Sequence, residues 1–213
     1  GGASGENPKS GKTAGRSKGT STSAASPAGS SKGKTAGGGG GKFLGPLVKV
    51  GPGGDFSTIG AALDYVKKNR SRYDTGSRRT SCRIEVNGGE TFSETIIVDN
   101  SSKAYPPGVQ IVSSGVGRAR LTPSGSGPAI RLIGLENWLV QGFDVDASGK
   151  DAAIELSGYL NRTSLKDLNV SGFKNVGVLL KGAIGFSNDE VVLEDLILRG
   201  SGGVTAGIHF ARE

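Results

Sequence analysis

The sequence predicts an all-β fold, a parallel β-helix of stacked coils that is closed at its amino-terminal end by one α-helix. Three observations predict it. Apolar patterns recur at intervals of 24 to 30 residues in the second half of the chain, the strands they mark are short, and no helix of ten or more residues fits between them. Parallel coiling of short strands fits this combination, whereas leucine-rich repeats and βαβ units need longer helices.

Residues 1–42 consist almost entirely of Gly, Ser, Ala, Thr and Lys and contain no aromatic residue. Such a segment buries too little apolar surface to offset the entropy of ordering it, which predicts a disordered, flexible linker. It holds seven basic residues and one acidic residue, so most of the net charge of +7 belongs to it. The predicted β-helix domain, residues 43–213, is nearly neutral, and we expect no specific nucleic-acid binding from it.

The chain starts at Gly1, contains no methionine, and stops at Glu213 within an apolar stretch. We therefore expect a fragment whose β-helix is truncated at the carboxyl end, with another domain tethered upstream of the linker. No run of eighteen apolar residues exists, so no membrane span is predicted. The single cysteine, Cys82, permits no internal disulfide and does not indicate a compartment.

The first ordered elements are predicted over residues 43–79. Leu47–Val50 alternates apolar and polar residues and is followed by the turn Gly51–Gly54, which indicates a strand entering a tight turn. Apolar residues at helical spacing then predict an amphipathic helix over Ser57–Asn69, with Ser57 or Asp55 as its N-cap. It would cover the open end of the first coil. The polar stretch Arg70–Arg79 is interpreted as a solvated loop.

Two interleaved repeats then define the coils. A coil of about 24 residues cannot bury its own apolar face, but stacked coils bury a continuous core. Residues two apart on a strand face the same way, so the paired apolar positions of each segment point inward. One series, at intervals of 24, 24 and 30 residues, is Ala129–Leu132, Ala153–Leu156, Gly177–Leu180 and Gly207–Phe210; the other, at intervals of 25 and 28, is Val140/Phe143/Val145, Leu165/Leu168/Val170 and Leu193/Leu196/Leu198.

Two motifs resemble the amino-terminal part of the pectin-lyase-like superfamily, and of its pectin methylesterase branch in particular. The segment Val48–Ile59 with Ala61–Leu63 is similar to that family's first strand and capping helix, and Gly88–Ile96 is similar to its Gly-x-Tyr-x-Glu strand, with Phe92 in place of tyrosine. The resemblance covers about residues 47–213. It implies a right-handed coil and favours an extracellular or cell-envelope location.

The resemblance does not extend to the family's catalytic motifs. Those esterases use paired aspartates flanked by glutamines and an arginine, and none of the corresponding segments occurs between Val109 and Glu213. The motifs of polygalacturonases and lyases are also missing. The arrangement as a whole resembles bacterial proteins in which a Gly/Ser/Lys linker joins such a β-helix to a protein-kinase domain.

Two sets of acidic residues are the candidates for chemistry. Asp144 and Asp146 should project from one outer face and are suited to bind Ca²⁺ or to do acid–base work, but their expected neighbours, Asn169 with Ile197 and Ser171 with Arg199, form no recurring ligand set. A solvated face is therefore favoured and no cofactor is predicted.

The pairs Lys166–Asp167 and Glu194–Asp195 share a register, which places Asp167 near Asp195 on adjacent coils. Such a carboxylate pair would supply an acid beside a base, although charged ladders at coil corners also serve solubility alone. Trp138 and Tyr159, each near a turn, are candidates to stack on sugar rings, and packing at a corner would explain them equally.

The leading functional hypothesis is a non-catalytic β-helix module on a flexible tether, which binds a polysaccharide or a protein partner on its exposed strand face. One alternative is a carbohydrate-active enzyme, a pectinesterase or a lyase, whose catalytic coils are partly missing from the fragment. A second alternative is that the basic tail docks onto nucleic acid or an anionic surface.

Overall fold

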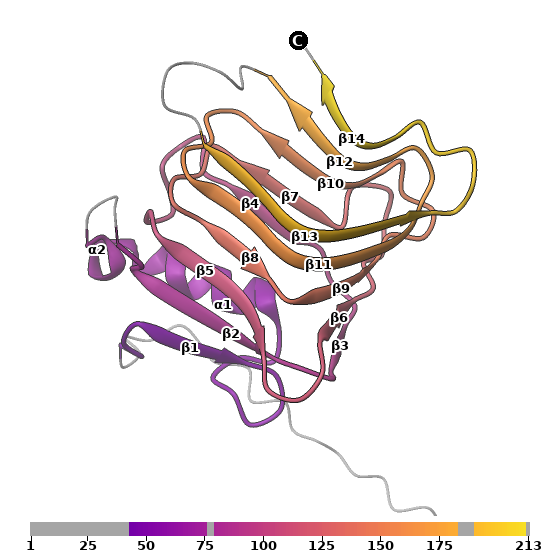
Figure 1. The fold of residues 1–213 in the computed structure, drawn as a ribbon. Helices are drawn as coiled ribbons and strands as arrows, with labels where there is room; N and C mark the ends of the chain where they lie inside the picture. Colours follow the sequence, from indigo (N-terminus) through magenta and orange to yellow (C-terminus); the bar gives the residue numbers. More distant parts are fainter. Residues whose placement is uncertain (1–42, 76–78, 183–189, 212–213) are drawn as a thin grey trace, which may run out of the picture. The chain divides into compact units, whose positions relative to one another are not determined.

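The computed structural model describes residues 43–75, 79–182 and 190–211, which form a parallel β-solenoid with a short helical segment at its start (Figure 1). The predicted fold class is confirmed. The linker predicted for residues 1–42 lies outside the described residues.

Strands stack coil upon coil, and every strand pairing is parallel. One row runs from β1 through β2, β5 and β8, a second from β3 through β6 and β9, and a third from β4 through β7, β10 and β12 to β14. The long strands β11 and β13 bend, so the first half of β11 pairs with β8 and its second half pairs with β9. The strands are β1 (Leu47–Val50), β2 (Cys82–Asn87), β3 (Thr91–Phe92), β4 (Ile96–Asp99), β5 (Val109–Ser114), β6 (Ala119–Leu121), β7 (Ile130–Ile133), β8 (Leu139–Gln141), β9 (Phe143–Asp146), β10 (Ala152–Ser157), β11 (Thr163–Phe173), β12 (Val176–Lys181), β13 (Val191–Gly200) and β14 (Ala206–Ala211).

The register confirms both sequence repeats. In the third row, Ile154 is the partner of Ile130 and of Val178, and Val178 is in turn the partner of Ile208. In the first two rows, Leu165 lies between Val140 and Leu193, and Val170 lies between Val145 and Leu198. Equivalent apolar residues therefore stack at the strand spacing of about 4.8 Å, which makes one continuous core.

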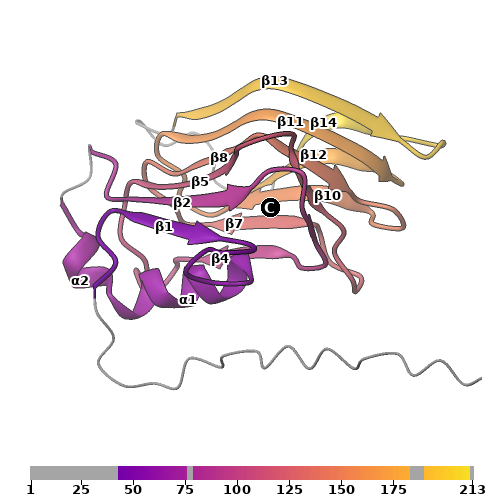
Figure 2. The same cartoon turned by 90° about the horizontal axis from the view of Figure 1, so that it is seen from below.

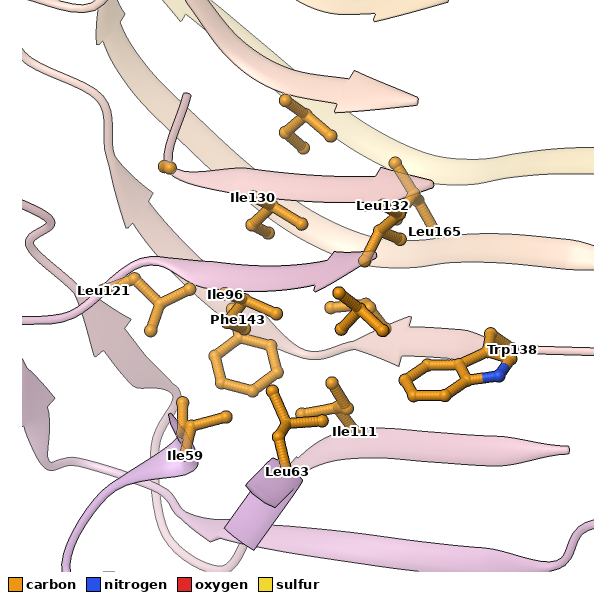
Figure 3. Close-up of a cluster of buried hydrophobic side chains, with 14 of the residues drawn as sticks. Ile59, Leu63, Ile96, Ile111, Leu121, Ile130, Leu132, Trp138, Phe143 and Leu165 are labelled. Atoms are coloured by element: carbon orange, nitrogen blue, oxygen red, sulfur yellow. The ribbon is translucent and has the colours of Figure 1, made fainter. Parts of the chain in front are cut away.

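That core begins at α1 (Ile59–Lys68), which contacts β1, β2 and β4 and covers the first coil (Figure 2). Ile59 and Leu63 of the helix are buried and lie in one cluster with Ile96, Ile111 and Phe143 of the solenoid (Figure 3). The predicted capping role of the helix is confirmed. Neither described helix is long and apolar enough to cross a membrane.

The N-cap of α1 is Thr58, whose hydroxyl accepts from the Ala61 N–H at 3.2 Å. The prediction of Ser57 or Asp55 was wrong. The Asp55 carboxylate instead accepts from the backbone N–H of Lys49 at 2.8 Å, which closes the turn after β1. That contact holds Asp55 in the turn, and the helix begins three residues later, where the Thr58 hydroxyl reaches the Ala61 N–H.

The carboxylate of Glu94 holds the same helix end from a distance in the sequence. It accepts from the backbone N–H groups of Ile59 and Gly60, each at 2.8 Å. These are two of the amides that a helix leaves without an internal partner, and the negative charge also complements the positive end of the helix dipole. The segment after β3 is thereby tied to the cap.

The loop predicted over Arg70–Arg79 begins instead as a second short helix, α2 (Arg70–Tyr73). Its Tyr73 ring is buried and packs on Phe43 with ring centroids 4.9 Å apart. The charge pattern predicted a solvated loop because it does not reveal that this one aromatic side chain packs into the core.

Candidate functional site

A bend between the two halves of β11 and β13 produces a ladder of equivalent positions, one per coil. Gly142, Asp167 and Asp195 occupy it, as the strand partners on either side show, and Arg118 is level with Gly142 by the pairing of β6 with β9. The backbone is left-handed at three of these positions, with φ of 84° at Gly142, 51° at Asp167 and 54° at Asp195. Gly and Asp adopt this conformation more readily than most residues, so the recurring aspartate has a backbone cause.

Arg118 reaches along this ladder past Gly142, which has no side chain, to Asp167. Its Nη1 donates to the Asp167 carbonyl oxygen at 2.6 Å, and its Nη2 pairs with the Asp167 carboxylate. Its Nε lies 3.8 Å from Asp144 Oδ1. One guanidinium thus ties together three successive coils, and Asp167 is an ion-paired carboxylate.

The residues that precede the two aspartates, Lys166 and Glu194, form an ion pair with each other. Lys166 and Glu194 are direct strand partners, and their Nζ and Oε2 atoms lie 2.5 Å apart. Asp195 shares the ladder position of Asp167, as expected, but its carboxylate forms no hydrogen bond or ion pair with another described residue. The contacts of Asp167 are therefore with Arg118, and the structure shows no shared-proton contact between the two aspartates.

Beside the ladder, outward side chains of the second row form a polar strip. Asp144 lies opposite Asn169, and Asp146 opposite Ser171, as the sequence predicted. The Asn169 amide donates to Asp144 Oδ1 at 3.3 Å, and Arg199 Nη1 donates to Asn169 Oδ1 at 2.6 Å. A chain of hydrogen bonds therefore runs from coil to coil along the outer surface.

Asp146 has two partners. The Ser148 hydroxyl donates to it at 2.6 Å and Arg120 Nη2 at 2.9 Å. The hydroxyl and backbone N–H of Ser148, followed by Arg120, hold the pKa of Asp146 below its ordinary value against the opposing effect of burial. We call the charged and polar side chains of the ladder and the strip the polar corner: Arg118, Arg120, Asp144, Asp146, Lys166, Asp167, Asn169, Glu194 and Arg199.

The polar corner offers no metal-ligand set. Asp144, Asp146, Asp167 and Glu194 each face an Arg or Lys side chain, which neutralises the charge that would attract a cation. Over residues 43–75, 79–182 and 190–211, no group of three or more His, Cys, Asp or Glu side chains gathers in a way that suits a metal ion.

The two aromatic candidates lie in opposite environments. Trp138 is only 1% exposed, donates from Nε1 to the Pro106 carbonyl at 3.2 Å and packs edge-on against Tyr105. Its ring fills the core and presents no face to a sugar, which corrects that part of the sequence hypothesis. Tyr159, between β10 and β11, is 54% exposed and remains available.

One charged cluster was not foreseen from the sequence. Glu155 on β10 is 8% exposed and lies between Arg131 of β7, at 2.8 Å, and Lys181 of β12, at 3.1 Å. Burial alone would raise the pKa of Glu155, but the two cations outweigh it and lower the pKa. Arg131 and Glu155 occupy the same position of the 24-residue repeat, a signal that could have revealed the contact.

Comparison with known proteins finds no relative: no protein-family model, no curated protein and no solved structure matches the chain. The solenoid and its polar corner are therefore interpreted from their own geometry and chemistry.

Proposed function

We propose that the solenoid is a non-catalytic binding module that holds a polysaccharide on the polar corner. The observation that carries the proposal is the pairing of charge there: exposed carboxylates alternate with guanidinium and ammonium groups on rigid strands. Paired groups of this kind retain free lone pairs and N–H bonds, which can exchange water for sugar hydroxyls without leaving a charge unbalanced.

The geometry of the strip supports a long ligand. Arg120, Asp144 and Asn169 are consecutive strand partners, so polar groups repeat about every 4.8 Å along the solenoid axis. Their positions are fixed by the sheet and by the hydrogen bonds between them, so little side-chain entropy is lost on binding. A polymer of similar repeating units can meet the same chemistry at each coil.

The resemblance of the first coils to the pectin-lyase-like superfamily is a second support, because it implies a right-handed β-helix and a carbohydrate ligand. The same resemblance also supports the alternative function, a carbohydrate-active esterase or lyase. Against that alternative, the Asp167 carboxylate is engaged by Arg118 and not by a second acid, so the paired carboxylates expected of the enzyme do not meet. The binding hypothesis therefore fits the contacts better.

The test is a glycan-array screen of the full chain, followed by calorimetry on the best ligand. The double variant Arg120→Gln and Arg199→Gln should weaken binding at least tenfold, whereas Lys49→Gln on the exposed face of β1 is the matched control and should bind normally. Deleting residues 1–42 should leave binding unchanged, which separates this proposal from docking by the basic tail.

Activity is measured in parallel on pectin, as ester hydrolysis and as chain cleavage. We expect binding without turnover. Turnover that disappears in Asp167→Asn or Asp195→Asn would overturn the proposal in favour of the enzyme. Absence of binding to every polysaccharide on the array would also contradict it and would redirect attention to a protein partner.

A further inference from the structure

Positive and negative charges are equal in number within the polar corner. Its inner coils, up to the end of β11, contribute three cations and three carboxylates: Arg118, Arg120 and Lys166, and Asp144, Asp146 and Asp167. Strand β13 adds one of each, Arg199 and Glu194. Counting the neighbouring Asp195 as well would leave one carboxylate in excess. The surface therefore has no surplus of positive charge, with or without the last described coil.

The balance is also local, because the cations and carboxylates contact each other. Asp144 shares a cation: its Oδ1 lies 3.8 Å from Nε of Arg118, whose guanidinium also pairs with Asp167. The Asn169 amide compensates, since its nitrogen donates to Asp144 at 3.3 Å and its oxygen accepts from Arg199 at 2.6 Å. An amide aligned in this way carries the attraction from the carboxylate to the guanidinium. The other carboxylates have direct ion pairs, Asp146 with Arg120 and Glu194 with Lys166.

A ligand with its own negative charges gains little from such a surface. An anionic group that approaches a guanidinium here also approaches the carboxylate paired with it, so attraction and repulsion oppose each other over similar distances. If the anionic group displaced Asp146 from Arg120, the Asp146 side chain, which is 27% exposed, would lose its cation and face a second negative charge. The ion pairs of the protein therefore compete with an acidic ligand.

Sugar hydroxyls suit the same surface better. Each of the two lines of outward strand partners contains a cationic donor, a carboxylate acceptor and a group that does both: Arg120, Asp144 and Asn169 in one line, and Arg199, Asp146 and Ser171 in the other. A hydroxyl has one O–H to donate and two lone pairs to accept with, so it can bridge a guanidinium and a carboxylate without separating them.

We propose that the polysaccharide held by the polar corner is uncharged, a polymer whose units present hydroxyl groups and no carboxylates or sulfates. This inference rests on the proposed function and narrows it to one class of ligand. Binding to such a polymer changes no net charge on either partner, so its affinity should vary little between low and high salt.

Immobilised polysaccharides in matched pairs that differ in charge test the inference: mannan and carboxymethyl mannan, hydroxyethyl cellulose and carboxymethyl cellulose, and carboxyl-reduced and native polygalacturonate. The basic residues 1–42 of the full chain attract acidic polymers by themselves, so the quantity measured is the binding that is lost when the corner is changed. The double variant Arg120→Gln and Arg199→Gln should weaken binding to the neutral member about tenfold and leave the acidic member within about twofold. Lys49→Gln is the control and should change neither.

Removing two carboxylates should reverse the preference. The double variant Asp144→Asn and Asp146→Asn leaves two cations uncompensated, so its affinity for native polygalacturonate should rise about tenfold and become sensitive to salt. An unchanged affinity would contradict the argument from charge balance. Binding that depends on the corner but favours the acidic member of a pair would overturn this inference alone, whereas no binding to any member would overturn the proposed function with it.

Discussion

The two ends of the solenoid contrast sharply although they are built from the same repeat. At the first coil, Ile59 and Leu63 of α1 are buried at 0% and 3% exposure. At the last described coil, Ile208 and Phe210 hold inward positions but remain at the surface. The repeat specifies which residues face inward, and only a covering element makes them a core.

The first coil also has polar contacts that the last described coil lacks. Thr58 and Glu94 together satisfy three backbone N–H groups at the start of α1. At the last described coil, the far edges of β13 and β14 have no strand partners among the described residues. Capping a solenoid thus requires both apolar burial and satisfaction of backbone groups.

The largest predicted difference is in the loss of stability when an apolar side chain is truncated at the first coil or at the last described coil. Leu63→Ala should lower the free energy of unfolding by about 2–5 kcal/mol, the usual cost of a cavity in a packed core. Ile208→Ala should cost less than about 1 kcal/mol, because its side chain is already 43% exposed. Urea unfolding of the two variants measures both losses, and equal losses would contradict the contrast.

Removal of the Glu94 carboxylate should come next in size. Glu94→Ala should cost about 2 kcal/mol, since two backbone N–H groups lose a charged acceptor at a helix N-terminus. Glu90→Ala in the exposed turn before β3 is the matched control and should stay within about 0.5 kcal/mol of wild type. A normal unfolding midpoint for Glu94→Ala would show that the cap does not depend on this contact.

A smaller effect should appear on acidification. The pKa of Glu155 is lowered in the folded state, so its stabilising contribution is complete above the pKa of the unfolded chain and is lost as pH falls through the folded value. The free energy of unfolding should therefore decrease from neutral to acidic pH. In Glu155→Gln the curve should start lower and be less steep, and an unchanged slope would argue against the Arg131–Glu155–Lys181 contact.

The smallest effect is expected at the polar corner, away from both ends. Asp167→Asn should change stability by less than about 1 kcal/mol, because the pair with Arg118 is solvent-exposed and asparagine also tolerates the left-handed backbone. Asp167→Ala should cost about 1 kcal/mol more, because alanine does not adopt a φ of 51° readily. Thermal melts of the two variants make the comparison, and identical melting temperatures would exclude the backbone explanation.

The sequence predicted the stacking register because a repeat of fixed spacing returns each apolar residue to the same position. Ile130, Ile154, Val178 and Ile208 are strand partners as predicted, and Asp144 lies opposite Asn169. The alternation of apolar and polar residues along each strand and the number of residues per coil were sufficient to predict this register.

Contacts that depend on three-dimensional reach were not predictable in the same way. Arg118 meets Asp167 two coils further on, a separation of 49 residues that no pattern of adjacent coils indicates. Trp138 was placed near a turn by its sequence position, yet its ring turns inward to meet Tyr105 and the Pro106 carbonyl. Side-chain direction at a corner is set by tertiary packing, which spacing alone does not record.

Hydrogen–deuterium exchange on dilute protein tests the contrast between the ends most directly. We predict that amides of α1 and β2 exchange slowest, and that amides of β13 and β14 exchange fastest among the strands, because local opening there exposes little additional apolar surface. Equal protection in the two regions, or slower exchange in β14 than in β2, would contradict the conclusion that the first coil is capped and the last described coil is not.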